Sequence, residues 1–294
     1  MGSVCVRSTI DRDLCTCASG TDANTRNRIS LAQWSLHRAY KEGQLDPMDF
    51  ARYTREQFGI AGIEYVNQFY RSKARDGAWV MELRRRADDA GVVSVLIMVD
   101  AEGVLGSPSA VEREKSVQAH RRWLDAAATL GCHSIRVNAH SEGDAATQLA
   151  LCADGIGRLC EYAAASGLAV LIENHGGESC HGDWVATLVR RIGLPNCGTL
   201  PDFGNFKCAD GTMMDRYAGV EAMIPFARRL SAKSHDFDER GEESSTDFAR
   251  MLAIARGAGY TGWVGAEYEG NRLSEPQGIV ATRDLLLRLG CVAE

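Results

Sequence analysis

The amino-acid sequence predicts one (β/α)8 TIM-barrel domain over residues 28–294, preceded by an extension over residues 1–27. From about residue 29, strand-like and helix-like segments alternate, and strand-like segments begin about 30 residues apart, the length of one barrel unit. Polar residues of metal-binding type end the last four of these segments. An open doubly wound sheet, the main alternative, usually has a glycine-rich phosphate-binding turn after an early strand, and none is present. A closed barrel is therefore the expected architecture.

Eight short apolar segments are the predicted strands. The segment 92–99 is apolar enough to be buried on both faces, as strands of a parallel sheet are. The segment 168–173 leads directly from apolar residues into Glu173, Asn174 and His175, which is typical of a barrel strand that ends at an active site. The expected strands are 30–36, 60–67, 92–99, 134–138, 168–173, 198–202, 231–235 and 262–268.

Helix signals lie between the predicted strands. Asp46 and Pro47 combine an N-cap with a proline at the first helical position. Ser109 and Glu112 form a capping-box pair. Gly91 follows an amphipathic segment and ends it. The expected helices are 47–58, 74–90, 109–130, 144–166, 183–192, 216–229, 246–257 and 275–289.

Residues 1–27 differ from the rest of the chain. They are polar and show neither helical nor strand periodicity, so we expect a disordered extension or the remnant of a leader. No apolar core of a secretory signal is visible, and no segment approaches the roughly 18 apolar residues of a membrane span. We expect a cytoplasmic protein without a membrane partner, or a periplasmic one if an export leader was removed.

Composition narrows the class of protein. An apolar fraction of 45% with 24% charged residues is that of a globular protein with a large core. Acidic residues outnumber basic ones by 39 to 33, and the net charge of -6 argues against a nucleic-acid partner. The ten cysteines lack zinc-ribbon spacing and the density of a disulfide scaffold, so we expect most to be reduced core thiols. The one close pair, Cys15 and Cys17, has no histidine nearby.

Four residues form the predicted metal site. Glu173, Asp202, His235 and Glu267 end four successive predicted strands. Parallel strands direct their C-terminal ends to the same face of a barrel, so these side chains should converge. Three carboxylates and one imidazole suit one divalent cation, with Mn²⁺ preferred and Mg²⁺, Co²⁺ or Zn²⁺ as alternatives.

The strand ends also carry a recognisable pattern. The motifs Ile172-Glu-Asn-His-Gly, Pro201-Asp-Phe-Gly-Asn-Phe, Ala232-Lys-Ser-His-Asp-Phe and Gly265-Ala-Glu-Tyr-Glu-Gly resemble the xylose isomerase-like TIM-barrel family. That superfamily includes sugar phosphate isomerases/epimerases, ketose 3-epimerases, inosose dehydratases and the family 2 apurinic endonucleases. The resemblance covers about residues 29–290. It implies one divalent metal on the four predicted ligands and proton exchange by the two glutamates.

One departure from the family bears on the substrate. Ketose 3-epimerases carry a histidine three residues after the aspartate ligand, where this sequence has Asn205, which argues against a direct ketose 3-epimerase assignment. The combined motifs are more similar to a branch found near bacterial 3-keto-sugar degradation.

Further polar residues are expected at the same mouth. We predict catalytic roles for His175 and for Lys233, which shares a strand face with His235 because the side-chain period is two. A structural ion pair with a carboxylate is the alternative for Lys233, and a structural role is the alternative for His140. The predicted substrate-binding residues are Gln33, Asn138, His140, Asn205 and Glu269.

The expected function is that of a divalent-metal-dependent sugar isomerase or epimerase, which removes a proton next to a carbonyl through a metal-bound enediolate. The alternatives are a keto-sugar lyase or hydratase, an inosose-type dehydratase on the same site, and a non-catalytic sugar-binding barrel. An apurinic endonuclease needs many more histidines for its zinc site than the seven present. The expected partner is a small sugar or keto-sugar. The sequence leaves open whether the protein forms a homo-oligomer.

Overall fold

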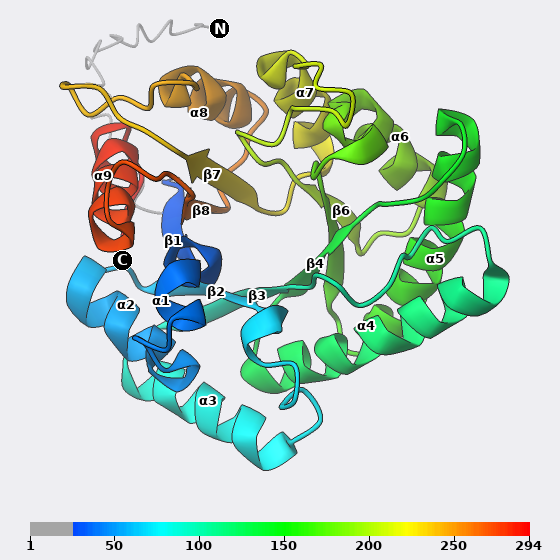
Figure 1. Cartoon of the computed structure of the whole chain (residues 1–294), viewed down its shortest axis with the longest axis horizontal. Helices are drawn as coiled ribbons and strands as arrows, with labels where there is room; N and C mark the ends of the chain where they lie inside the picture. The colour runs from blue at the N-terminus through cyan, green and yellow to red at the C-terminus, as the bar shows by residue number, and fades with distance from the viewer. Residues whose placement is uncertain (1–25) are drawn as a thin grey trace, which may run out of the picture.

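Residues 26–294 are described by the structure, a computed structural model, and they form a barrel of eight parallel strands surrounded by helices (Figure 1). The predicted fold class is thereby confirmed. The expectations for the extension up to residue 25, and for Cys15 and Cys17, lie outside the described residues. The strands are β1 Arg28–Ala32, β2 Gly62–Val66, β3 Val93–Met98, β4 Ser134–Asn138, β5 Ala169–Glu173, β6 Cys197–Leu200, β7 Leu230–Ser234 and β8 Trp263–Tyr268.

The sheet is continuous from β6 through β5, β4, β3, β2, β1 and β8 to β7, and all of its registered pairs are parallel. The remaining gap, between β6 and β7, is closed by two single bridges, Thr199 with Ala227 and Asp202 with Ser231. Around the second bridge, the Phe203 N–H donates to the Ser231 carbonyl and the Ser231 N–H donates to the Pro201 carbonyl, each at 3.0 Å. Asp202, the second residue after β6, lies at this narrow seam.

Within residues 26–294, every α-helix except His37–Lys41 lies where the sequence predicts a helix, with shifts of a few residues at the ends. Asp46 accepts the Met48 N–H at 2.9 Å, and Ser109 Oγ accepts the Glu112 N–H, as expected for N-caps. Ser274 and Gln277 form a complete capping box. The helices are α1 His37–Lys41, α2 Phe50–Phe58, α3 Gly77–Asp89, α4 Ala110–Leu130, α5 Ala145–Ala164, α6 Gly182–Ile192, α7 Arg216–Met223, α8 Phe248–Gly257 and α9 Glu275–Arg288.

Two predicted elements end several residues earlier than expected. The first strand ends at Ala32, and the chain continues as the 3-10 helix Gln33–Leu36, because Gln33 turns inward to bond neighbouring elements. The helix expected over 216–229 ends at Met223 and is followed by the 3-10 helix Ile224–Phe226. Pro225 has no N–H to continue the α-helix.

The core has an outer shell between strands and helices and a smaller cluster inside the barrel. The inner cluster fills part of the lumen with apolar side chains, among them Val66, Leu96, Met98, Leu171 and Leu200. Polar side chains also gather at the C-terminal ends of the strands. None of the helices between residues 26 and 294 is long and apolar enough to cross a membrane.

Asn27 belongs to the barrel although the sequence placed it in the extension. Its side chain is fully buried, and its Nδ2 donates to the carbonyls of Tyr260 and Gly262 at 3.2 Å each. Its Oδ1 accepts from Arg256 Nε at 3.0 Å. The ordered barrel thus begins by residue 27.

Candidate metal centre

Three of the four predicted ligands come together at the mouth of the barrel. Glu173 is the last residue of β5, Asp202 follows β6 at the seam, and Glu267 lies near the end of β8. One carboxylate oxygen of each lies within 4.8 Å of the other two, and all three residues are buried. The convergence predicted from the strand ends holds for this carboxylate triad.

Asp202 is held by its neighbours through one carboxylate oxygen. Its Oδ1 accepts the N–H groups of Gly204 and Asn205, each at 2.8 Å. Asn174 accepts the Asp202 N–H at 2.7 Å and donates to the Asp202 carbonyl at 3.0 Å, which ties the end of β5 to the end of β6. The other oxygen, Oδ2, lies 3.9 Å from Lys233 Nζ.

Two buried oxygens of the triad lack hydrogen bonds. Asp202 Oδ2 and Glu173 Oε2 receive none from the described part of the chain. Glu173 Oε2 lies 3.0 Å from Arg136 Nε, at an angle that makes no hydrogen bond. A buried charged oxygen without a partner is costly, and a bound cation removes that cost.

The electrostatics also fit a cation. Burial raises the pKa of Glu173 to about 7, with Arg136 opposing this shift and Glu267 adding to it. Burial likewise raises the pKa of Asp202 to about 7, where Lys233 opposes the shift and the two glutamates add to it. Among residues 26–294, five carboxylates form ion pairs at this mouth with only two cations, Arg136 and Lys233; they belong to Asp100, Glu173, Asp202, Glu267 and Glu269. Oxygen ligands with an excess of negative charge suit a hard divalent ion.

Arg136 is a site residue that the sequence interpretation missed. It projects from β4 into the lumen and is 5% exposed. Its Nη1 donates to Asp100 Oδ1 at 2.6 Å, and Asn138 Nδ2 donates to the same oxygen at 2.7 Å. Burial opposes ionisation of Asp100, but Arg136 and Asn138 lower its pKa to about 2. The signal was available: a lone arginine in a short apolar strand needs a buried partner.

Lys233 occupies the place facing the triad from β7. Its Nζ lies 3.2 Å from Glu267 Oε1, 3.4 Å from Glu269 Oε2 and 3.9 Å from Asp202 Oδ2. Burial disfavours its charge, but Glu267, Asp202 and Glu269 hold the pKa of Lys233 well above its usual value. Lys233 is therefore an ammonium group at the mouth, and it forms the ion pairs that were the structural alternative for it, while its catalytic role stays a prediction.

His235 differs from the expectation. It follows the last residue of β7, its side chain is exposed, and it is absent from the cluster of potential ligands. Its N–H donates to Glu243 Oε1 at 3.2 Å, so the chain already turns away from the lumen there. Strand periodicity no longer applies beyond Ser234, and the inward position on β7 is taken by Lys233.

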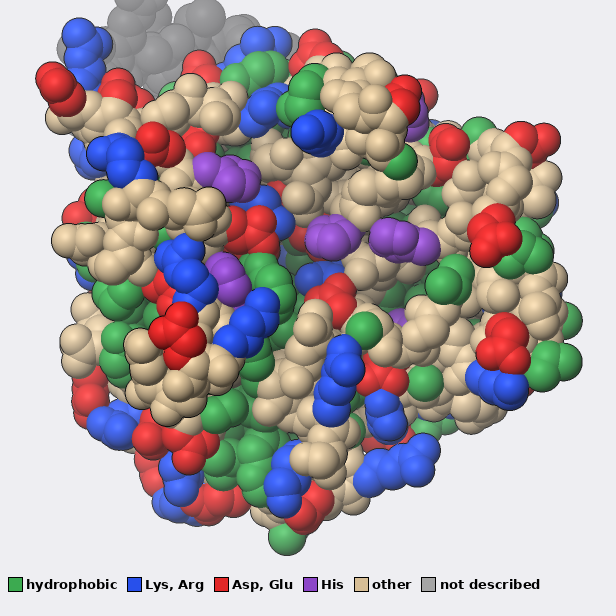
Figure 2. All heavy atoms as spheres, in the orientation of Figure 1, with side chains coloured by type: hydrophobic (Ala, Val, Ile, Leu, Met, Phe, Trp, Pro, Cys, Tyr) green, Lys and Arg blue, Asp and Glu red, His purple; other side chains and the backbone are tan. Residues whose placement is uncertain are grey.

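Histidines surround the mouth. They follow β1, β4, β5 and β7, and Figure 2 shows histidine side chains gathered around the centre of this face, with acidic and basic side chains between them. The rings of His140 and His175 are 6.3 Å apart. Burial lowers the pKa of both, helped by Arg136 and Lys233 at His175 and by His175 at His140. Both are neutral imidazoles at pH 7, able to donate and accept one hydrogen bond each.

The other predicted substrate-binding residues divide into two groups. Gln33 is fully buried, donates to the Tyr70 hydroxyl at 2.5 Å and accepts the Val66 N–H at 2.9 Å, so its amide has a structural role. Asn138 is bound to Asp100. Asn205 Nδ2 is buried without a hydrogen-bond partner in the described residues, and Glu269 is half-buried at the rim. The last two are placed to meet a ligand.

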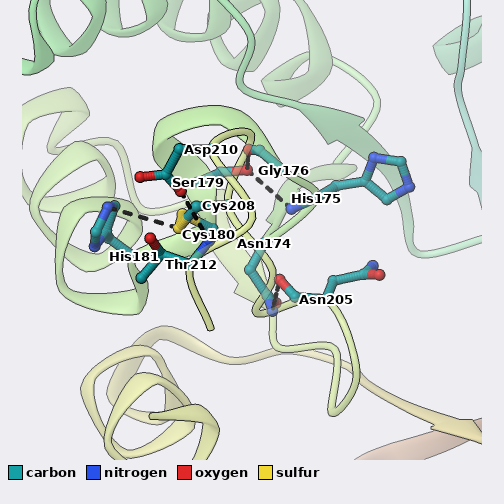
Figure 3. Close-up of a disulfide and its surroundings, with 10 residues drawn as sticks. All are labelled: Asn174, His175, Gly176, Ser179, Cys180, His181, Asn205, Cys208, Asp210 and Thr212. Carbon is teal, nitrogen blue, oxygen red and sulfur yellow. Dashed lines mark hydrogen bonds between the residues drawn. A yellow bond between two sulfur atoms is a disulfide. The ribbon is translucent and has the colours of Figure 1, made fainter. Parts of the chain in front are cut away.

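Cys180 and Cys208 form a disulfide, so they are exceptions to the reduced thiols expected for most cysteines (Figure 3). It joins the segment after β5 to the segment after β6, 28 residues apart in the sequence. The five other described cysteines are buried and free. The disulfide therefore connects the two loops that follow Glu173 and Asp202.

Comparisons with known proteins agree with the barrel fold. A family described as xylose isomerase-like TIM barrel matches residues 55–289. A curated relative, the 3'-dehydrocarminate deglycosidase alpha subunit of Microbacterium sp, is 22% identical, with 89% of this chain and 94% of the relative covered.

Two solved structures share the fold over most of their length. The 3-keto-D-glucoside 4-epimerase of E. coli has a TM-score of 0.66 at 16% identity, covering 90% of this chain and 99% of that one. A xylose isomerase-like TIM barrel protein of Mycobacterium smegmatis in complex with magnesium has a TM-score of 0.65 at 16% identity, covering 90% and 96%.

Proposed function

This chain belongs to the xylose isomerase-like TIM-barrel family, and from that premise we propose that it is a metal-dependent enzyme that removes a proton next to the carbonyl of a sugar or keto-sugar. The carboxylate triad carries the proposal. Glu173, Asp202 and Glu267 converge within 4.8 Å, and Glu173 and Asp202 each have a buried oxygen without a hydrogen bond. Such a set can hold one divalent cation with open positions for substrate oxygens.

The metal would be held by Glu173, Asp202 and Glu267, with Mn²⁺ as the preferred ion. When bound, it supplies Lewis-acid stabilisation of the negative charge that develops on the substrate oxygens. A fourth protein ligand is not required, because catalytic sites commonly keep positions open for water or substrate.

Glu173 and Glu267 are proposed as the acid–base pair. They come from β5 and β8, on opposite sides of the seam, so they can approach a substrate carbon from two directions. One carboxylate takes the proton from the carbon, and the other returns a proton to the opposite face in an epimerisation, or to the neighbouring carbon in an isomerisation. The environment that raises the proton affinity of Glu173 also suits it to this exchange.

Lys233 and the neutral imidazoles complete the site. The Lys233 ammonium is held by Glu267 and Glu269, and its N–H groups can donate to a substrate oxygen that becomes negative. His175 and His140 face the mouth as neutral donors. The Asn205 amide N–H is buried at the same mouth and has no hydrogen-bond partner within residues 26–294.

The substrate class is proposed to be a keto-sugar. One structural relative is named for action on a 3-keto-D-glucoside, and the curated relative is a deglycosidase of 3'-dehydrocarminate. A ketone makes the neighbouring C–H bond acidic, so a glutamate of the pair can remove that proton.

A second candidate is elimination of a glycoside bond, favoured by the deglycosidase relative. It has the same first step. The electron pair left on carbon then expels a leaving group β to the carbonyl, and that group takes a proton as it departs. The two candidates therefore differ in the fate of the carbanion, not in how it forms.

The test is an incubation of the purified protein with Mn²⁺ and a panel of 3-keto-glucosides in D₂O. Epimerisation is expected to place deuterium at a carbon next to the carbonyl in recovered sugar. Elimination is expected to release the free leaving group together with an unsaturated keto-sugar. Turnover without deuterium in any carbon-bound position of substrate or product would contradict epimerisation, and turnover without an unsaturated product would contradict elimination.

A further inference from the structure

A second group of potential ligands lies beside the metal centre but outside it. Cys180 ends the 3-10 helix Gly177–Cys180, His181 precedes α6, and Cys208 lies in the segment after β6. The Cα atoms of the two cysteines are 5.3 Å apart, and His181 Nε2 lies 3.8 Å from Cys208 Sγ. Figure 3 shows His181 on the opposite side of the disulfide from the imidazole of His175.

We infer that Cys180, His181 and Cys208 form a second metal site, selective for Zn²⁺, when the Cys180–Cys208 disulfide is reduced. An external dithiol supplies the two electrons and two protons that convert the disulfide into two thiols, and is itself oxidised to a disulfide. Zinc then binds the two thiolates and the imidazole nitrogen, and the two thiol protons pass to solvent. Oxidation releases the metal and restores the covalent bond.

The geometry suits tetrahedral zinc. With Zn–S of about 2.3 Å and Zn–N of about 2.0 Å, two ligand sulfurs lie roughly 3.8 Å apart, and a sulfur and a nitrogen roughly 3.6 Å apart. The distance from Cys208 Sγ to His181 Nε2 is already 3.8 Å. Once the bond is reduced, the two sulfurs have only to separate by side-chain rotation. The fourth position falls to a solvent water, since Cys208 and His181 are only half-buried.

The surroundings favour this chemistry over that of the carboxylate triad. Cys180 lies two residues before the N-terminal end of α6, where the helix dipole stabilises the negative charge of a thiolate. The carboxylate of Asp210 accepts the Thr212 N–H at 2.9 Å and lies near His181 (Figure 3). Two sulfurs and one nitrogen select a softer ion than the all-oxygen triad does, so each site should keep its own metal.

The site would stabilise the mouth in either redox state. Ser179, next to Cys180, accepts the His175 N–H at 2.8 Å and donates to the Gly176 carbonyl at 2.7 Å. The disulfide or the zinc ion thus joins the loop of His175 to the loop that follows Asp202.

Cobalt titration of the reduced protein tests the proposal, because thiolate ligands give Co²⁺ an intense near-ultraviolet charge-transfer absorption that carboxylates do not. Cys5, Cys15 and Cys17 are first changed to serine in the full-length chain, so that other thiols do not contribute. One equivalent of Co²⁺ is expected to produce the absorption, and an excess of Zn²⁺ to abolish it. Cys180→Ser and Cys208→Ser should lose the absorption, and His181→Gln should weaken binding at least about tenfold.

Two matched variants separate this site from its surroundings. Cys291→Ser removes a buried free thiol elsewhere, and Asp202→Asn disables the triad; both should keep the thiolate absorption. Absence of the absorption in the reduced protein, or its survival in both Cys180→Ser and Cys208→Ser, overturns the inference.

A second measurement holds even if the cysteine variants misfold. Zinc should protect Cys180 and Cys208 of the reduced parent protein from alkylation, as mapped by mass spectrometry. Equal alkylation with and without zinc overturns the site. Neither readout depends on turnover, so failure here leaves the proposed function standing.

Discussion

Arg136 Nε lies 3.0 Å from Glu173 Oε2, and the same guanidinium binds Asp100 through Nη1 at 2.6 Å. One buried cation therefore connects an acid of the carboxylate triad to an acid at the end of β3. Replacing Arg136 with methionine should leave both acids unpaired and destabilise the metal-free protein by about 3–5 kcal/mol, the cost of breaking a buried pair from one side. Urea unfolding measures this loss.

Saturating Mn²⁺ should reduce the effect of Arg136→Met, because a bound cation replaces part of the missing charge. The matched control is Arg52→Met, which removes exposed pairs with Asp49 and Glu56 on the protein surface and should change stability by no more than about 0.5 kcal/mol. Similar losses of stability for the two variants would show that the Arg136 charge does not stabilise the two buried acids.

Metal binding should depend on Asp202 and not on His235. Asp202→Asn removes one of three converging carboxylates and should lower Mn²⁺ affinity at least about tenfold. His235→Ala should retain one equivalent of Mn²⁺, since the imidazole is exposed and outside the cluster. Isothermal titration and metal analysis after gel filtration decide this, and loss of the ion in His235→Ala would mean that β7 extends further inward when the metal binds.

Proton transfer should depend on both glutamates. With metal at saturation, Glu173→Gln and Glu267→Gln are each expected to slow deuterium exchange into substrate by about 10²–10⁴-fold, the usual contribution of a positioned acid or base. Glu142→Gln, an exposed change in the loop after β4, is the matched control and should exchange at the parent rate. If either triad variant kept full exchange under metal saturation, that glutamate would be a ligand only.

Stability should fall with rising pH because of Glu64, which is fully buried inside the barrel and receives a hydrogen bond from Ser30 Oγ at 2.6 Å. Burial raises the pKa of Glu64 to about 7 from an ordinary value of 4.5. The folded state thus keeps a proton that the unfolded state releases between these two values. Its contribution is fully present below pH 4.5 and is lost as pH rises to about 7, by on the order of 3 kcal/mol.

Glu64→Gln should remove this part of the pH dependence. The variant is expected to be more stable than the parent at pH 8 and about equally stable at pH 4.5, as measured by urea unfolding in the presence of a chelator. A parent-like slope between these pH values would contradict a buried, protonated Glu64.

The start of the barrel can be tested by substitution and deletion. We expect deletion of residues 1–25 to preserve folding, because that segment has no periodic apolar pattern. Asn27→Ala should cost about 1–3 kcal/mol, because the carbonyls of Tyr260 and Gly262 then lose a buried donor. A large drop in melting temperature on deletion alone would show that residues 1–25 contribute to stability.

Most of the fold was predictable because each strand and helix carries its own local pattern. The strand 134–138 and the helix ending at Leu130 coincide with β4 and α4. Errors arose where a contact distant in sequence decides the outcome. Gln33 bends the chain into a 3-10 helix because its partner Val66 lies on the next strand.

The site residues also divide into those that a local pattern predicts and those that depend on contacts distant in sequence. Glu173 and Glu267 lie within strands, where the alternation of side chains gives their direction. His235 lies one residue beyond β7, where the direction depends on Glu243 eight residues later. The Cys180–Cys208 pairing joins two loops whose proximity appears only once the barrel closes.

The two ends of the described chain lie side by side, which allows the chain to be opened at another place. The Ile29 N–H donates to the Val292 carbonyl at 2.7 Å, and the Val292 N–H donates to the Asn27 carbonyl at 2.9 Å. A short peptide linking these ends would leave the circle of strands intact, so residues 26–294 are suited to circular permutation. The seam between β6 and β7 is the natural place for new ends, because two single bridges span it where other neighbouring strands share continuous ladders.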